Sequence, residues 1–153
     1  MNLRIRLAQN VDLEELAQMM ASLWPDAEIA ELRLELSSKL KEELPKTLPA
    51  TILVAQIDDG PLIGFLEVGL RSHADGCNPA RPVGFVEGWF VDESFRGRGI
   101  GRELMDGAEE WARGHGCREM ASDALIDNDL SLKAHEALGF EVVDRCVHFR
   151  KSL

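Results

Sequence analysis

Residues 83–101 read VGFVEGWFVDESFRGRGIG and join an apolar run to a turn rich in glycine and arginine. The run from Val83 to Val91 has the composition of a central strand, yet it holds one carboxylate, Glu87, next to Gly88. Glycine inside a strand often marks a bulge. The sequence therefore predicts a buried strand with a bulge at its one acidic residue.

The turn that follows, RGRGIGR at 96–102, stands in front of an amphipathic helical pattern. Glycines let successive backbone N–H groups point into one concavity, and a helix N-terminus adds positive charge, so the turn predicts a phosphate-binding site. No Gly-Lys-Ser/Thr follows, and the glycine spacing departs from GxGxxG, which disfavours nucleotide hydrolysis and hydride transfer. The alternative is a plain glycine-rich turn with solvated arginines.

The rest of the chain predicts an alternation of strands and helices around this stretch. Alternating or continuous apolar runs predict strands at 3–7, 51–57, 62–70, 83–91 and 118–124, with a hairpin turn at Asp59-Gly60. Helical spacing predicts helices at 13–23, at 29–40, from the glycine-rich turn to about Gly114, and from the capping run DND at 127–129 to Gly139. Asp12 and Glu15 resemble a capping box for the first helix.

The last residues, 140–150, are rich in Val and Phe and predict two final strands. Together these elements predict one mixed α+β domain over residues 1–153. Its central twisted sheet has about seven strands, and about four helices flank the sheet.

Composition limits the class of protein further. The chain has 153 residues, 45% of them hydrophobic, and a net charge of −10, which fits one domain and opposes binding to nucleic acid or anionic membranes. The same charge favours cationic partners. No apolar run has the roughly 20 residues of a membrane span, and the start MNLRIR is not a signal peptide, so we expect a cytoplasmic protein.

Cysteine and histidine spacing gives no sign of a metal centre. The three cysteines, Cys77, Cys117 and Cys146, form no CxxC pair, and we expect reduced, buried thiols. The four histidines show no ligand spacing such as HExxH. We therefore expect no metal.

Two separated motifs resemble a known family. Residues 90–101 read FVDESFRGRGIG, and Asn128 and Ser131 precede ALGF at 137–140, which looks like the signature of the GCN5-related N-acetyltransferase superfamily. The resemblance follows the whole chain in element order. It implies a loop for the pyrophosphate of acetyl-coenzyme A and a strand that bonds its pantetheine arm. The implied cofactor residues are Trp89, Phe90, Val91, Arg96, Gly97, Arg98, Gly99, Ile100, Gly101, Arg102 and Asn128.

A closer resemblance exists within that superfamily. LWP at 23–25, FVEGWFV at 85–91, GCREMASD at 116–123 and KAHEALGF at 133–140 are similar to the bacterial aminoglycoside 6′-N-acetyltransferases. This implies transfer of acetyl to the 6′-amino group of aminoglycosides, which confers resistance, by a homodimer joined through the last strands or the second helix. The positions that match the family's aminoglycoside pocket are Trp24, Glu87, Asp123 and Asp144. His73 is the further pocket candidate, at a place where the family often has tyrosine and this chain departs from the pattern.

Acetyl transfer to an amine needs a neutral amine, stabilisation of the carbonyl oxygen and a proton for the departing thiolate. Glu87 can accept the amine proton, and backbone N–H groups at 89–91 can polarise the carbonyl. Many members of the superfamily use tyrosine as general acid, but this chain has none. His135 lies near that position by the family match and is the candidate acid, with a packing histidine as the alternative.

Other acceptors stay open at this stage. A polyamine, another small amine or a protein N-terminus would use the same cofactor loop and the same base. A module that senses acetyl-coenzyme A without catalysis would keep only the loop.

Overall fold

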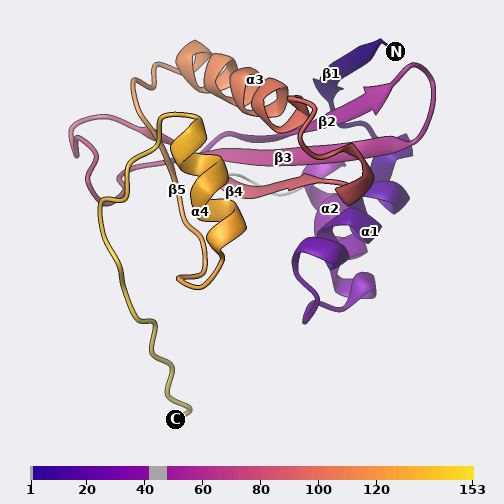
Figure 1. The fold of residues 1–153 in the computed structure, drawn as a ribbon. Helices are drawn as coiled ribbons and strands as arrows, with labels where there is room; N and C mark the ends of the chain where they lie inside the picture. The colour runs from indigo at the N-terminus through magenta and orange to yellow at the C-terminus, as the bar shows by residue number, and fades with distance from the viewer. Residues whose placement is uncertain (1, 42–47) are drawn as a thin grey trace.

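The fold is one mixed sheet with helices on both faces (Figure 1). A computed structural model describes residues 2–41 and 48–153. In these two ranges five strands lie in the order β1-β2-β3-β4-β5. Their bounds are Leu3–Leu7 (β1), Ala50–Ile57 (β2), Leu62–Arg71 (β3), Val83–Val91 (β4) and Met120–Ser122 (β5). The first four pair antiparallel in chain order, and β5 pairs parallel to β4.

Within the described residues, four α-helices cover the sheet. They are α1 (Leu13–Leu23), α2 (Ile29–Lys41), α3 (Ile100–Gly114) and α4 (Asp129–Ala137), and short 3-10 turns occur at Asn10–Asp12 and Glu93–Phe95. α1 and α2 lie under one face and α3 lies over the other, while α4 lies beside β5 (Figure 1). Alternate residues of β2 and β3 therefore face two separate cores: Val54 and Phe65 pack with α1 and α2, and Leu53 and Leu66 pack with α3.

The structure confirms the mixed α+β class, the bulged central strand and the hairpin turn between β2 and β3. The predicted capping box is wrong. Asp12 instead accepts two hydrogen bonds from Arg6, at 2.7 and 2.8 Å, and a third from the Gln9 N–H. The Glu15 side chain accepts the Leu62 N–H at 2.7 Å. Both carboxylates are thus used in tertiary contacts, which the sequence spacing alone does not reveal.

The end of the chain also differs from the prediction. Residues 140–153 hold no helix or strand, so the described sheet has five strands rather than about seven. Phe140 still contacts His135, and Val143 lies close to Gly76; beyond these residues the chain leads away from the body (Figure 1). The predicted strand at 118–124 shrinks to Met120–Ser122. Cys146 lies on this tail and is exposed, and Cys117 is the buried cysteine. The Val- and Phe-rich tail has strand composition, but it has no strand partner within the described chain.

None of the helices in the described residues is long and apolar enough to cross a bilayer.

Candidate active site

The glycine-rich turn forms an open cradle at the start of α3. Gly97 and Gly99 have φ of +74° and +82°, a left-handed backbone that glycine adopts without strain, and Gly99 is the N-cap of α3. A Cβ placed on either glycine would meet no atom within 4 Å. Glycine is therefore required at these positions by the positive φ of the backbone and not by a lack of space for a side chain. Their N–H groups, with the first turn of α3, fit an anion such as a pyrophosphate.

The three arginines around the cradle are held in different ways. Arg96 donates from Nε to the Val91 carbonyl at 2.9 Å, which ties the turn back to the end of β4. Arg102 donates to the Ala137 carbonyl at 3.3 Å and so links α3 to the end of α4. The Arg98 guanidinium lies 5.3 Å from the Phe95 ring centroid. Three fixed positive charges thus surround the predicted cofactor loop.

β4 and β5 diverge beside this loop. They pair only at residues 84–86 with 120–122, whereas β4 continues to Val91. Residues 88–91 stay paired with β3 but have no described strand on the β5 side, so their backbone donors and acceptors on that edge lack a ladder partner. Trp89, Phe90 and Val91 lie on this free edge. An extended amide-containing chain such as pantetheine fits there by adding to the strand.

Trp89 connects the free edge to the loop. A Cβ on Gly101 would come 3.1 Å from its Cζ2 atom, so the indole packs closely against the first turn of α3, and a side chain there would press on the ring. The indole N–H is buried and has no hydrogen-bond partner among the described residues. A buried donor without an acceptor is costly, and an acceptor-rich ligand in this cleft would satisfy it. The residues present therefore fit coenzyme A.

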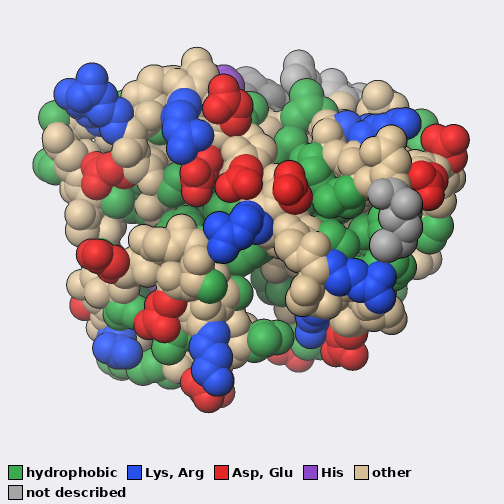
Figure 2. Space-filling view, turned by 45° about the horizontal axis from the view of Figure 1, so that its top comes forward, with side chains coloured by type: hydrophobic (Ala, Val, Ile, Leu, Met, Phe, Trp, Pro, Cys, Tyr) green, Lys and Arg blue, Asp and Glu red, His purple; other side chains and the backbone are tan. Residues whose placement is uncertain are grey.

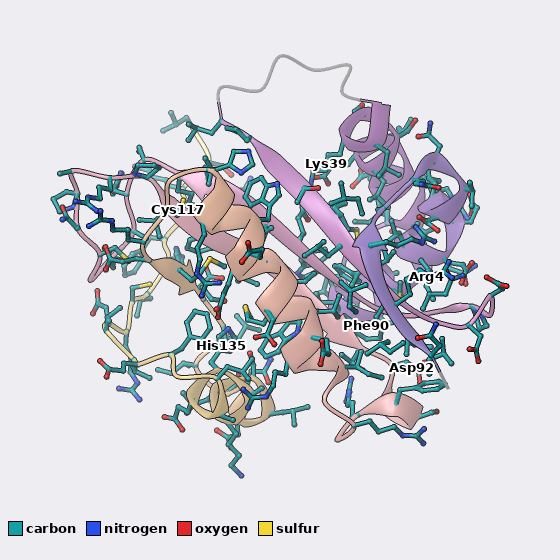
Figure 3. The ribbon with its side chains drawn as sticks, turned by 90° about the horizontal axis from the view of Figure 1, so that it is seen from above. Arg4, Lys39, Phe90, Asp92, Cys117 and His135 are labelled. Atoms are coloured by element: carbon teal, nitrogen blue, oxygen red, sulfur yellow. The ribbon has the colours of Figure 1, made fainter. Side chains whose placement is uncertain are left out.

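His135 belongs to α4 and, when the molecule is seen from above, lies on the other side of α3 from Lys39 (Figure 3). Its Nδ1 atom lies 2.7 Å from the Ser131 carbonyl oxygen, and its Nε2 atom lies 2.8 Å from Ser122 Oγ. A carbonyl can only accept, so Nδ1 carries a proton. Nε2 shares a hydrogen bond with the Ser122 hydroxyl, which donates to the neutral ring and accepts from the imidazolium. The ring also meets Trp89 and Phe140 edge-on, at 5.3 and 5.2 Å between centroids.

Ser122 therefore belongs with His135, and sequence reasoning missed it. It is the last residue of β5 and pairs with Val86, at the point where the two strands separate. Both nitrogens of His135 are engaged, so any proton that the imidazole gives to a group in the cleft would pass through the Ser122 hydroxyl. No local pattern links the two residues, because the contact depends on how α4 packs against β5.

Asn128 acts as a helix cap. Its side-chain oxygen accepts the Ser131 N–H at 3.0 Å and begins α4. This cap fixes the helix that carries His135. The predicted contact between Asn128 and the cofactor stays a prediction.

An open cavity of about 520 Å³ lies on the opposite face of the sheet, between α1, α2 and the strands β3 and β4. Trp24 lines it, and a Cβ on Gly88 would come 2.8 Å from the indole, so the glycine at the bulge lets the ring lie against β4. The indole also contacts the core through Phe65, at 6.5 Å between centroids. This half-buried aromatic surface fits a sugar ring.

Glu87 lines the same cavity and is the extra residue of the bulge. Val68 pairs with Val86 and Glu67 pairs with Gly88, which leaves Glu87 without a partner on β3. The predicted bulge is thus confirmed, and it turns the carboxylate toward the cavity. The Arg71 side chain holds this carboxylate through contacts of 2.9–3.1 Å, and its guanidinium lies 3.4 Å from the Phe85 ring centroid.

Sequence reasoning also missed a second carboxylate in the cavity, that of Glu67. It is 6% exposed, and the Lys39 ammonium contacts it at 2.5 Å and Glu35 at 2.9 Å. Burial alone would lower the pKa of Lys39, but the two carboxylates outweigh burial and raise it. One signal was available: Glu67 is the one charged residue in the apolar run 62–70, as Glu87 is in 83–91.

Three residues predicted for the aminoglycoside pocket do not line this cavity. His73 is exposed in the loop after β3, and Asp144 is exposed on the tail. Asp123 is exposed one residue beyond the last β4–β5 pair, which places it next to the mouth of the cleft. The single chain therefore brings together Trp24 and Glu87, while the roles of the other three residues stay predictions.

The described residues contain no group of three or more histidine, cysteine or acidic side chains arranged to hold a metal ion. Acidic side chains nevertheless line up across the middle of the face shown in Figure 2, with basic ones around them. The chemistry that the geometry offers is anion binding on one side of β4 and cation binding on the other.

Comparison with known proteins places the chain. It belongs to the acetyltransferase (GNAT) family, whose sequence model matches residues 14–140. Aminoglycoside N(6′)-acetyltransferase type 1 of Klebsiella aerogenes is 38% identical over 149 residues, covering 97% of this chain and 96% of that protein. The enzyme of the same name from Salmonella typhimurium is 36% identical over 152 residues, covering 96% and 97%.

Two solved structures resemble the fold closely. AAC(6′)-Iy, in complex with the bisubstrate analog CoA-S-monomethyl-acetylneamine, has a TM-score of 0.87 and 33% identity, with complete coverage of both chains at 100%. The aminoglycoside 6′-N-acetyltransferase AAC(6′)-IG of Acinetobacter haemolyticus, solved in its apo form, has a TM-score of 0.85 and 30% identity, covering 98% of this chain and 99% of that one.

Proposed function

We propose that this protein transfers the acetyl group of acetyl-coenzyme A to the 6′-amino group of aminoglycoside antibiotics and thereby confers resistance to them. The observation that carries the proposal is the position of Glu87. It directly follows the last β4–β5 pair, so a carboxylate in a cavity with an indole wall stands beside the cleft that fits coenzyme A. The names of the enzymes that are similar over nearly the whole chain support the same reaction.

Glu87 is the proposed general base. It binds the 6′-ammonium by charge and takes its proton, directly or through one water, before the amine nitrogen attacks the acetyl carbonyl carbon. The C–N bond forms in a tetrahedral adduct, the nitrogen loses its second proton to solvent, and the C–S bond then breaks to give the amide and the thiolate. Backbone N–H groups on the free edge at 89–91 are proposed to stabilise the carbonyl oxygen while it is negative in this adduct.

His135 is the proposed source of the proton for the departing thiolate. Because Ser122 fills its Nε2 position, the proton passes from the imidazolium to the serine oxygen while the serine hydroxyl proton moves to sulfur. The loop from Arg96 to Arg102 binds the pyrophosphate. Asn128 is proposed as a further cofactor contact, and His73, Asp123 and Asp144 as further contacts to the aminoglycoside.

We also propose a homodimer, joined through the exposed tail. Val142, Val143, Val147 and Phe149 are 47, 64, 75 and 93% exposed, an apolar display that is unusual for a free segment. One edge of β5 has no described partner, and a tail from a second copy fits there as an added strand. Light scattering is expected to give about twice the chain mass of 17.0 kDa. A mass of one chain would contradict the dimer.

The remaining proposals concern the setting of the reaction. We propose that residues 1–153 act as one catalytic domain in the cytoplasm, where free thiols are the ordinary state of cysteine. The net charge of −10 supports cationic small molecules as partners and opposes nucleic acid and anionic membranes.

The test is release of free coenzyme A with matched acceptors. Neomycin and paromomycin carry an amino and a hydroxyl group, respectively, at the 6′ position, and spermidine and a short peptide represent other amines. We expect turnover with neomycin and none with the other three. Turnover confined to spermidine or the peptide would keep the cofactor site and overturn the aminoglycoside proposal, and binding of acetyl-coenzyme A without turnover would indicate a sensing module.

A further inference from the structure

Glu87 has a cation of the chain's own as its partner. Arg71, the last residue of β3, donates from Nε and Nη2 to Oε1 at 3.1 and 2.9 Å, and from Nη2 to Oε2 at 3.0 Å. Both side chains are partly exposed, at 45 and 38%. An exposed pair contributes little to stability, but a forked guanidinium restrains a carboxylate in direction.

The contacts leave the carboxylate unequally occupied. Each oxygen of a carboxylate can accept about two hydrogen bonds. Oε1 already accepts two from Arg71, whereas Oε2 accepts one. One acceptor direction, on Oε2, is therefore left for the amine or for a bridging water.

Arg71 is itself held in place. Its guanidinium carbon lies 3.4 Å from the centroid of the Phe85 ring, and Phe85 is only 6% exposed. Phe85 and Glu87 are two residues apart on β4, so one ring supports the guanidinium that orients the next side chain on the same face. The arrangement is a stack of ring, guanidinium and carboxylate built from two adjacent strands.

The other cation that lines the cavity with Glu87 has partners of its own. In the cavity, Lys39 of α2 pairs with Glu35 and with Glu67 of β3, and α1 contributes the uncharged Trp24. Asp123, after β5, is the nearest acidic residue along the neighbouring strand and is exposed. Arg71 is thus the cation that the described structure places in contact with Glu87.

We propose that Arg71 is a positioning residue for acetyl transfer. It fixes the Glu87 carboxylate so that the free acceptor direction of Oε2 meets the 6′-amine, and it stays in place during the reaction. This inference rests on the proposed role of Glu87 as general base. It adds a residue that neither charge pattern nor family motif singled out.

The test compares Arg71→Ala, Arg71→Lys and Glu87→Gln with neomycin as acceptor. Misplacement of a catalytic group can lower a rate by about 100-fold, so we expect kcat of Arg71→Ala to fall by about 10- to 100-fold with a smaller change in KM. Arg71→Lys should recover only part of kcat, because an ammonium cannot form the fork. Arg113→Ala, which removes an exposed ion pair on α3, is the matched control and should keep wild-type kinetics.

Chemical rescue separates positioning from simple charge. Millimolar guanidinium chloride should raise kcat of Arg71→Ala, whereas sodium chloride at equal ionic strength should not. If Arg71→Ala keeps kcat, or if its KM falls and guanidinium competes with neomycin, Arg71 is not a positioning residue and the inference is wrong. Glu87→Gln with wild-type activity would instead overturn the role of Glu87. Arg71→Gln, read by acetyl-coenzyme A binding and kcat, replaces Arg71→Ala if the latter does not fold.

Discussion

The cofactor loop at 96–102 and the acceptor cavity under β3 and β4 lie on opposite sides of the central strand, and different forces shape them. The loop is shaped by its own backbone: Gly97 and Gly99 take positive φ, and no side chain packs against either glycine. The cavity is shaped by side chains from several elements, and each carboxylate that lines it already holds a cation of the chain: Glu35 and Glu67 contact Lys39, and Glu87 contacts Arg71. The cofactor loop is thus free to bind an anion, whereas the carboxylates of the acceptor cavity are already paired with Lys39 and Arg71.

The difference predicts that single substitutions act on one ligand at a time. The largest effect is expected for Glu87→Gln, which keeps the shape of the side chain but removes base and charge. General-base catalysis contributes about 100- to 10,000-fold, so kcat/KM for neomycin should fall by that order. Steady-state thiol release measures it. An unchanged kcat/KM would remove Glu87 from the mechanism.

The next largest effect is expected for Lys39→Met, which leaves the buried Glu67 carboxylate without its cation. An unsatisfied buried group costs about 1–3 kcal/mol, so Tm should fall. A substrate ammonium can then replace the lysine, so neomycin should raise Tm more in this variant than in the wild type. Thermal unfolding with and without neomycin checks this.

The double variant Lys39→Met/Glu67→Gln is the control for that prediction. With the carboxylate removed, the extra stabilisation by neomycin should disappear. If the extra stabilisation persists in the double variant, Glu67 does not face the aminoglycoside, and a substrate ammonium does not replace Lys39 there.

Gly99→Ala tests the other half of the site. Left-handed backbone costs a residue with a Cβ about 1–2 kcal/mol, and no neighbour clashes, so the loop should relax when empty and bind acetyl-coenzyme A about 5- to 30-fold more weakly. KM for acetyl-coenzyme A reports it. Gly114→Ala, in a helix and with open space, is the matched control and should leave this KM unchanged.

The smallest effect on either ligand is expected for the Arg6–Asp12 pair, which lies outside both halves of the site. The hydrogen bonds from Arg6 lower the pKa of Asp12 despite its burial. A lowered carboxyl pKa stabilises the fold above the unfolded pKa, about 3.9, and this stability is lost as pH falls through the folded pKa. Urea unfolding of the wild type should weaken in acid, and Asp12→Asn should flatten this dependence, with kcat at neutral pH unchanged. An equally steep curve would show that another group titrates.

The sequence predicts the cofactor loop better than the acceptor cavity, because the loop is shaped locally and the cavity depends on contacts between distant elements. The loop is local, so glycine spacing before a helix predicts it, and Gly88 predicted the bulge at Glu87. The partners Arg71 and Lys39 come from other elements, and pairing depends on register and packing that no spacing encodes. Ser122 was missed in the same way, because α4 brings His135 to it.

The C-terminal tail shows another limit of prediction from the sequence. Residues 140–150 have the composition of strands, and the prediction of two strands there was wrong for the single chain. A strand needs a partner, and strand composition does not reveal whether the partner lies in the same chain. The five-stranded sheet and the exposed Val and Phe side chains are consistent with a partner elsewhere, as the proposed homodimer requires.

The most direct test of the two-sided account is a crossed binding measurement. Calorimetric titration of acetyl-coenzyme A and of neomycin into Glu87→Gln and Gly99→Ala gives four affinities to compare with the wild type. The account predicts that Glu87→Gln weakens neomycin and spares acetyl-coenzyme A, while Gly99→Ala does the reverse. Equal weakening of both ligands in either variant would contradict separate sites on the two sides of β4.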